Sequence, residues 1–210
     1  MICHPLRALA LLGVLGLTAC TSAPLHYYTL VAPQADSGAQ AGAASAPDLS
    51  FELLPVSVPA QVDQPQLVVR SGAQGMQLLN GERWIAPLAD ELRSALAANL
   101  THALPARDAS GLPADGRPRL RIKFDVRRFD SQPGQYALLA GTWSVRPVQG
   151  ARAGQVETTL TCADSVRESV GPGYPALVEG HQRALARVAA HIAAAARAVV
   201  AGQTAACPTR

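Results

Sequence analysis

One stretch near the middle of the chain alternates strictly between apolar and polar side chains, and it constrains the fold more than any other feature. The apolar members are Leu120, Ile122, Phe124 and Val126, and the polar members are Arg119, Arg121, Lys123, Asp125 and Arg127. Alternation with a period of two predicts a β-strand that is buried on one face and solvated on the other. The basic row is either a binding stripe or a solvated sheet face, and we favour the solvated face.

Two further strands are predicted after this one. Ser131–Gly134 forms a turn, Tyr136–Val145 has strand character and contains Trp143, and Gln149–Gly154 forms a second turn. A third strand, Val156–Val166, places Cys162 on its apolar face. Strands joined by short turns pair in order, so the sequence predicts an antiparallel meander.

Two segments have helical periodicity. Between Pro87 and Pro105 a leucine recurs every four residues, at Leu88, Leu92, Leu96, Leu100 and Leu104. This spacing predicts an amphipathic helix whose apolar stripe packs on a core. A second, longer helix is predicted from Tyr174-Pro175 to Gly202, and its core positions are Val178, Leu185, Val188, Ile192 and Val199. Its arginines and His191 argue against a membrane span, because charges are costly in lipid.

The first part of the chain is predicted to contain short strands. They are expected at 26–31, 49–58, 66–70 and 76–79, with a hairpin turn at Asn80-Gly81. Residues 107–118 are predicted to form a loop, and residues 33–47, rich in Ala, Gly and Ser, a flexible one. We therefore predict an α+β fold with a mixed, largely antiparallel sheet and two main helices packed on one face, in the order β-β-α-β-β-β-α.

The N-terminus resembles the export signal of a bacterial lipoprotein. Arg7 precedes an apolar run, Ala8–Leu17, and Leu17-Thr18-Ala19-Cys20 resembles a lipobox. This interpretation makes residues 1–19 a signal peptide, Cys20 the lipidated first residue, 20–25 a leader and 26–210 a single domain. The alternative is an ordinary signal peptide with a cysteine at its end by chance.

The two cysteines left in the mature chain predict a disulfide. Cys162 and Cys207 remain after Cys3 and Cys20 are assigned to the signal and the anchor, and in an exported chain they are expected to form a disulfide; two free, buried thiols are the alternative.

The whole chain has 18 basic and 15 acidic residues, and loss of Arg7 with the signal leaves a net charge of +2. This near balance gives no case for nucleic-acid binding.

The sequence has no recognisable motif of catalysis or metal binding. His181 and His191 are ten residues apart, which is not a metal-ligand spacing, and the chain has no nucleophile elbow, phosphate-binding loop or Cys-x-x-Cys pair. We expect no enzyme activity, cofactor or metal. A periplasmic hydrolase remains an alternative that would require His102 or His181 beside a carboxylate in a pocket.

The order of parts resembles the ABC-type transport auxiliary lipoproteins, the group that includes the PqiC (YmbA) lipoprotein. The resemblance rests on Tyr27–Leu30 after the lipobox, the run Val56–Arg70 with its Asp63-Gln64-Pro65-Gln66 core, Glu82–Leu88 with its Arg83-Trp84 pair, the Trp143 strand and Tyr174–Val178. It spans nearly the whole mature chain. Two departures are the insertion at 33–47 and the weakly aromatic Ala60-Gln61-Val62.

The resemblance implies a non-enzymatic periplasmic component that works with an MCE-domain protein and inner-membrane permease subunits in moving lipids or hydrophobic compounds between membranes. It also implies self-assembly, for example into a ring. The residues expected to contact a partner are Pro59, Asp63, Pro65, Arg70, Arg83 and Trp84, although Trp84 is equally well explained as a core residue. Thr21 follows Cys20 where retention in the inner membrane would call for aspartate, so the outer membrane is expected. A structural outer-membrane lipoprotein without a transporter is a further alternative.

Overall fold

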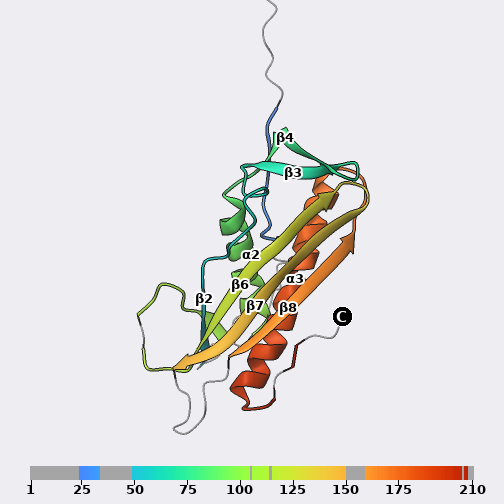
Figure 1. The fold of residues 1–210 in the computed structure, drawn as a ribbon. Coiled ribbons are helices and arrows are strands. Elements are labelled where there is room, and N and C mark those ends of the chain that lie inside the picture. The colour runs from blue at the N-terminus through green and yellow to red at the C-terminus, as the bar shows by residue number, and fades with distance from the viewer. Residues whose placement is uncertain are drawn as a thin grey trace, which may run out of the picture.

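The protein folds into two sheets and two helices (Figure 1). The computed structural model describes residues 24–33, 49–104, 106–113, 115–149, 159–204 and 206–207. The predicted signal, Cys20 and nearly all of the predicted loop at 33–47 lie outside these residues. The elements are β1 (His26–Tyr28), β2 (Leu49–Leu53), β3 (Gln66–Ser71), β4 (Gly75–Trp84), α2 (Leu88–Ala103), β5 (Ala106–Asp108), β6 (Arg119–Gln132), β7 (Tyr136–Gln149), β8 (Leu160–Ser169) and α3 (Tyr174–Val200).

The larger sheet has five strands in the order β5-β2-β6-β7-β8. The β6-β7-β8 part is the predicted antiparallel meander, whereas β5, β2 and β6 run parallel to one another. Both helices cover one face of this sheet, which confirms the predicted α+β class (Figure 1). On the other face, Arg121 pairs with Glu52 and Lys123 with Asp125, each at 2.8 Å.

Two predicted boundaries were wrong in this sheet. Arg107 and Asp108, predicted to begin a loop, belong to β5 (Ala106–Asp108), which pairs with β2. The strand predicted at 49–58 ends at Leu53, and Ser57 makes only an isolated bridge to Asp125. Pro55 lies between them and has no N–H to donate to a ladder, which explains the early end.

The smaller sheet has three strands in the order β1-β4-β3 and lies across one end of the larger one (Figure 1). The predicted hairpin turn at Asn80-Gly81 was wrong, because both residues lie inside β4. The chain instead turns at residues 72–74, where Gly72 adopts a φ of 72°. The partner of β3 shifts from Leu78, opposite Val68, to Arg83, opposite Gln66, so Asn80-Gly81 occupies an irregularity and not a turn.

The helices use their apolar stripes as predicted. The leucines at 88, 92, 96, 100 and 104 are all buried. α3 packs closely on the sheet through Gly180, where a Cβ would lie 2.2 Å from Val170 Cγ1 and 3.0 Å from Ala137 Cβ. Neither described helix has the length and apolar character needed to cross a membrane.

The disulfide expected between Cys162 and Cys207 is present in the structure, with a Cα–Cα distance of 5.4 Å. It attaches the segment after α3 to β8. Closing a loop of this length is expected to stabilise the fold by about 3–4 kcal/mol, chiefly by restricting the unfolded chain.

Candidate functional site

A β-bulge in β6 brings the charged side chains of the candidate site to one face of the larger sheet. The register of β6 against β7 shifts between Val126 and Arg128, so the alternation of side chains reverses at that point. Before the bulge, Val126 is buried in the core. After it, Phe129 and Ser131 contact His181 of α3, whereas Asp130 turns to the opposite face and contacts Arg70 and Arg128. The hairpin of β3 and β4 packs over this part of the face.

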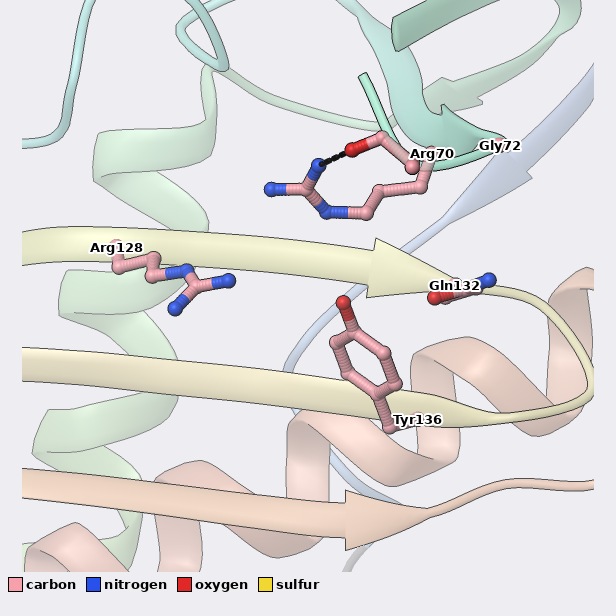
Figure 2. A pocket seen from close by; sticks show the side chains of 6 residues that line it. Arg70, Gly72, Arg128, Gln132 and Tyr136 are labelled. Atoms are coloured by element: carbon pink, nitrogen blue, oxygen red, sulfur yellow. Dashed lines mark hydrogen bonds between the residues drawn. The ribbon is translucent and has the colours of Figure 1, made fainter. Parts of the chain in front are cut away.

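An open pocket of about 590 Å³ lies between the β3–β4 hairpin and the strands β6 and β7 (Figure 2). β6 contributes Arg128 and Gln132, β7 contributes Tyr136, and the hairpin contributes Arg70 with the turn residues. The full lining is Arg70, Gly72, Ala73, Arg128, Gln132 and Tyr136. Four of these six residues have polar or cationic side chains, so the pocket suits a charged group better than an apolar one.

Asp130 holds the two arginines of the pocket in place. Its carboxylate is 3% exposed and accepts hydrogen bonds from Arg70 Nε at 2.7 and 2.9 Å and from Arg128 Nη2 at 2.7 Å. Burial alone would raise the pKa of Asp130, but the hydrogen bonds from Arg70 and Arg128 bring it below its ordinary value. Asp130 is therefore ionised at neutral pH and joins the two sheets.

The cluster keeps an excess of positive charge. Two guanidinium groups, those of Arg70 and Arg128, share the single carboxylate of Asp130. A third, that of Arg167, lies over the ring of Tyr136, with its guanidinium carbon 3.4 Å from the centroid. Arg128 is 54% exposed, and neither its Nη1 nor Arg70 Nη2 has a hydrogen-bond partner among the described residues. Such paired donors suit a carboxylate or a phosphate group.

A second polar contact lies on the helix side of β6. Ser131 Oγ and His181 Nε2 are 2.8 Å apart, and the imidazole stacks on Phe129 with ring centroids 3.9 Å apart. Phe129 in turn meets the edge of Trp84, so this stack joins α3, the larger sheet and the smaller sheet. Burial lowers the pKa of His181 to about 3, which makes the ring neutral.

This contact does not provide the pocket that the hydrolase alternative requires. Ser131 is 4% exposed and His181 is 2% exposed, and neither lines the Arg70–Arg128 pocket. His181 Nδ1 has no hydrogen-bond partner among the described residues, so no carboxylate there orients the ring. His102, the other candidate, is exposed on the last turn of α2. The described residues also contain no group of three His, Cys, Asp or Glu side chains able to hold a metal ion.

The residues predicted to contact a partner fall into two groups. Pro65, Arg83 and Trp84 lie together, because the Trp84 N–H donates to Pro65 O at 2.9 Å and Arg83 pairs with Gln66. A turn closed by the Asp63 N–H on Pro59 O, at 3.2 Å, leads into this group. Arg70 lies at the other end of β3, in the pocket. Trp84 is 5% exposed, which places it in the core.

Sequence reasoning missed Asp130, Arg128 and Tyr136. The alternation that predicted β6 ends at Arg127, and the two adjacent arginines at 127 and 128 were the only local sign of the bulge. The contact of Arg70 with Asp130 joins residues 60 positions apart, which no periodicity reports.

Comparison with known proteins agrees with this architecture. The family model of the ABC-type transport auxiliary lipoprotein component matches residues 28–193. The chain belongs to this family. Membership makes it a transport-associated lipoprotein of the cell envelope.

Solved structures share the fold at low sequence identity. A crystal structure described only as that of an uncharacterized protein has a TM-score of 0.61 and 20% identity, covering 84% of this chain and 99% of its own. Protein XCC0632 from Xanthomonas campestris has a TM-score of 0.50 and 18% identity, covering 84% of this chain and 96% of its own. No curated protein shows significant similarity.

Proposed function

We propose that this protein is a non-enzymatic adaptor of an MCE/ABC-type system that moves lipids or hydrophobic compounds between the two membranes and so supports the integrity of the outer membrane. Acyl chains on Cys20 anchor it to the periplasmic face of the outer membrane. The observation that carries the proposal is the family match over residues 28–193. The lipobox-like Leu17-Thr18-Ala19-Cys20 supports the anchor.

The Arg70–Arg128 pocket is the proposed point of contact with the MCE-domain partner. Its surplus guanidinium donors suit an acidic side chain, and Arg–carboxylate pairs combine charge with fixed geometry. Asp130 holds both arginines, so less side-chain freedom is lost when the partner binds.

Co-purification from cross-linked envelopes tests this proposal, and Lys123 supplies a matched control. Arg128 and Lys123 both lie on β6, are 54% and 52% exposed, and pair with an aspartate two residues further along. Arg128→Gln should reduce recovery of the MCE protein, and Lys123→Gln should not. If the wild type recovers no MCE protein, the adaptor function is wrong and a structural lipoprotein becomes the better hypothesis. Equal recovery with both variants would exclude the pocket as the contact.

The anchor is tested separately with Cys20→Ala. The variant should leave the membrane fraction and appear in the soluble periplasmic fraction, because the acyl chains provide the attachment. Membrane separation on a density gradient then distinguishes outer from inner membrane for the wild type. A Cys20→Ala protein that is still processed and membrane-bound would contradict lipidation at this residue.

Self-assembly and the hydrolase alternative are tested separately. Cross-linked products at multiples of the chain mass would support self-assembly, for example as a ring. Ser131→Ala should keep transport function intact, since Ser131 is proposed to be structural. A complete loss of transport in a folded Ser131→Ala protein would favour the hydrolase instead.

A further inference from the structure

One face at the junction of β1 and β4 carries exposed apolar side chains. Tyr27 lies directly opposite Arg83 in the parallel ladder, and the ladder continues with the Ile85 N–H donating to Tyr28 O at 2.9 Å. Side chains that are opposite each other, or two apart along a strand, share a face. Leu25 precedes β1 and Ile85 follows β4, each by one residue, and with Tyr27 and Arg83 they form one surface, here called the β1–β4 face.

The opposite side of β1 and β4 packs against the rest of the domain, so the β1–β4 face points toward solvent. Trp84 is buried there, and the Tyr28 hydroxyl donates to Glu82 Oε2 at 2.6 Å. On the β1–β4 face, by contrast, Leu25 is 48% exposed, Tyr27 54% and Ile85 62%. Neighbouring apolar side chains left in solvent on a folded domain usually mark a contact surface.

The position of Cys20 identifies what this face meets. Leu25 lies five positions after Cys20, and five extended residues span at most about 18 Å. An acylated Cys20 would therefore hold the β1–β4 face within this distance of the bilayer surface. Aliphatic side chains beside a tyrosine and an arginine match the composition of membrane interfaces. Arg83 has no carboxylate partner among the described residues, which leaves its charge available to anionic headgroups.

We propose that the β1–β4 face contacts the lipid bilayer and fixes the orientation of the domain on the membrane. This proposal rests on the acyl anchor at Cys20 that forms part of the proposed function. Acyl chains alone fix the location of the domain but leave its rotation free. Insertion of Leu25, Tyr27 and Ile85 into the interface removes that freedom.

Fluorescence quenching by brominated lipids tests the contact. The native tryptophans, Trp84 and Trp143, are buried, so a new tryptophan at a surface position reports on its own surroundings. Ile85→Trp is the probe, and Leu112→Trp is the control, because Leu112 is 57% exposed and lies in the loop between β5 and β6. The lipidated full mature chain is reconstituted in vesicles of brominated phosphatidylcholine with anionic phosphatidylglycerol. A second preparation couples the unacylated mature chain through Cys20 to a maleimide-bearing phospholipid.

Ile85→Trp should show strong quenching in both preparations, and Leu112→Trp should match the wild type. Adding Tyr27→Ser to Ile85→Trp should weaken the quenching. If Ile85→Trp is quenched no more than Leu112→Trp in the maleimide-coupled preparation, the proposal is overturned. A blue-shifted Ile85→Trp emission in solution, before vesicles are added, would also overturn it by showing that a second copy covers the face. The mass of Cys20 from cells separately decides whether the proposed anchor exists.

Discussion

The five-stranded sheet buries its apolar face beneath two helices, whereas the three-stranded sheet leaves apolar side chains in solvent. Phe51, Ile122 and Phe124 in the larger sheet are 0% exposed. Of the seven large apolar side chains that are exposed among the described residues, five lie in or next to the smaller sheet: Leu25, Tyr27, Met76, Leu78 and Ile85. The larger sheet with its two helices therefore holds most of the buried core, whereas the smaller sheet carries most of the exposed large apolar side chains.

The two regions are joined at two places, one apolar and one ionic. The apolar joint is the stack of His181, Phe129 and Trp84, and the ionic joint is the pair of Arg70 and Asp130. If the comparison is right, perturbing the joints or the buried core should affect stability, and trimming the exposed side chains of the smaller sheet should not.

The largest expected effect is that of acid on the apolar joint. The pKa of His181 is about 3 in the folded protein and about 6.5 when unfolded, so the unfolded chain binds one more proton between these values. The stability contributed by neutral His181 is complete above pH 6.5 and should fall by about 1.4 kcal/mol per pH unit as pH decreases through this window. Denaturant unfolding measured from pH 7 to pH 4.5 checks this slope.

His181→Gln should remove that slope, and His102→Gln, on an exposed position of α2, should retain it. Titration of the His181 ring signals by NMR in the wild type provides a measurement that does not depend on a variant folding. A ring that titrates near pH 6.5 would show that this joint is solvated and would contradict the interpretation.

A smaller effect is expected from a matched pair of leucines. Leu96 in α2 is 0% exposed, and Leu78 in β4 is 47% exposed. Leu96→Ala should lower the free energy of unfolding by about 3 kcal/mol, because it combines lost burial with a cavity. Leu78→Ala should change it by less than about 0.5 kcal/mol, as is usual for surface positions. Equal losses in thermal or denaturant unfolding would remove the distinction between the core beneath the helices and the exposed side chains of the smaller sheet.

The smallest effect is expected at the ionic joint. Arg70→Gln removes the hydrogen bonds that β3 makes to Asp130, while Arg128 still neutralises the carboxylate. Amide hydrogen exchange should become faster in β3 and β4 and remain unchanged in β7, because only the attachment of the hairpin is weakened. Arg128→Gln, which removes a contact within β6, should leave exchange in the hairpin unchanged. Faster exchange throughout the domain would mean that the two sheets unfold as one unit.

The sequence by itself determined the features that depend on local periodicity. The alternation at 119–127 predicted β6, and the leucine repeat from Leu88 predicted α2, because burial of one face imposes a period of two on strands and about 3.6 on helices. The paired Cys162 and Cys207 and the family membership were also accessible from the sequence.

Tertiary structure alone decided the features that depend on pairing across the chain. The bulge after Val126 turns Asp130 toward Arg70, the irregularity in β4 places Asn80-Gly81 inside a strand, and the fold places His181 against Ser131. Each of these contacts joins residues that a local pattern treats as independent. A hydrophobic period fixes which side of a helix or strand is buried. The element that covers this side depends on strand register and on the order of connections. Register and connections therefore set where the charged pocket and the apolar face of this protein lie.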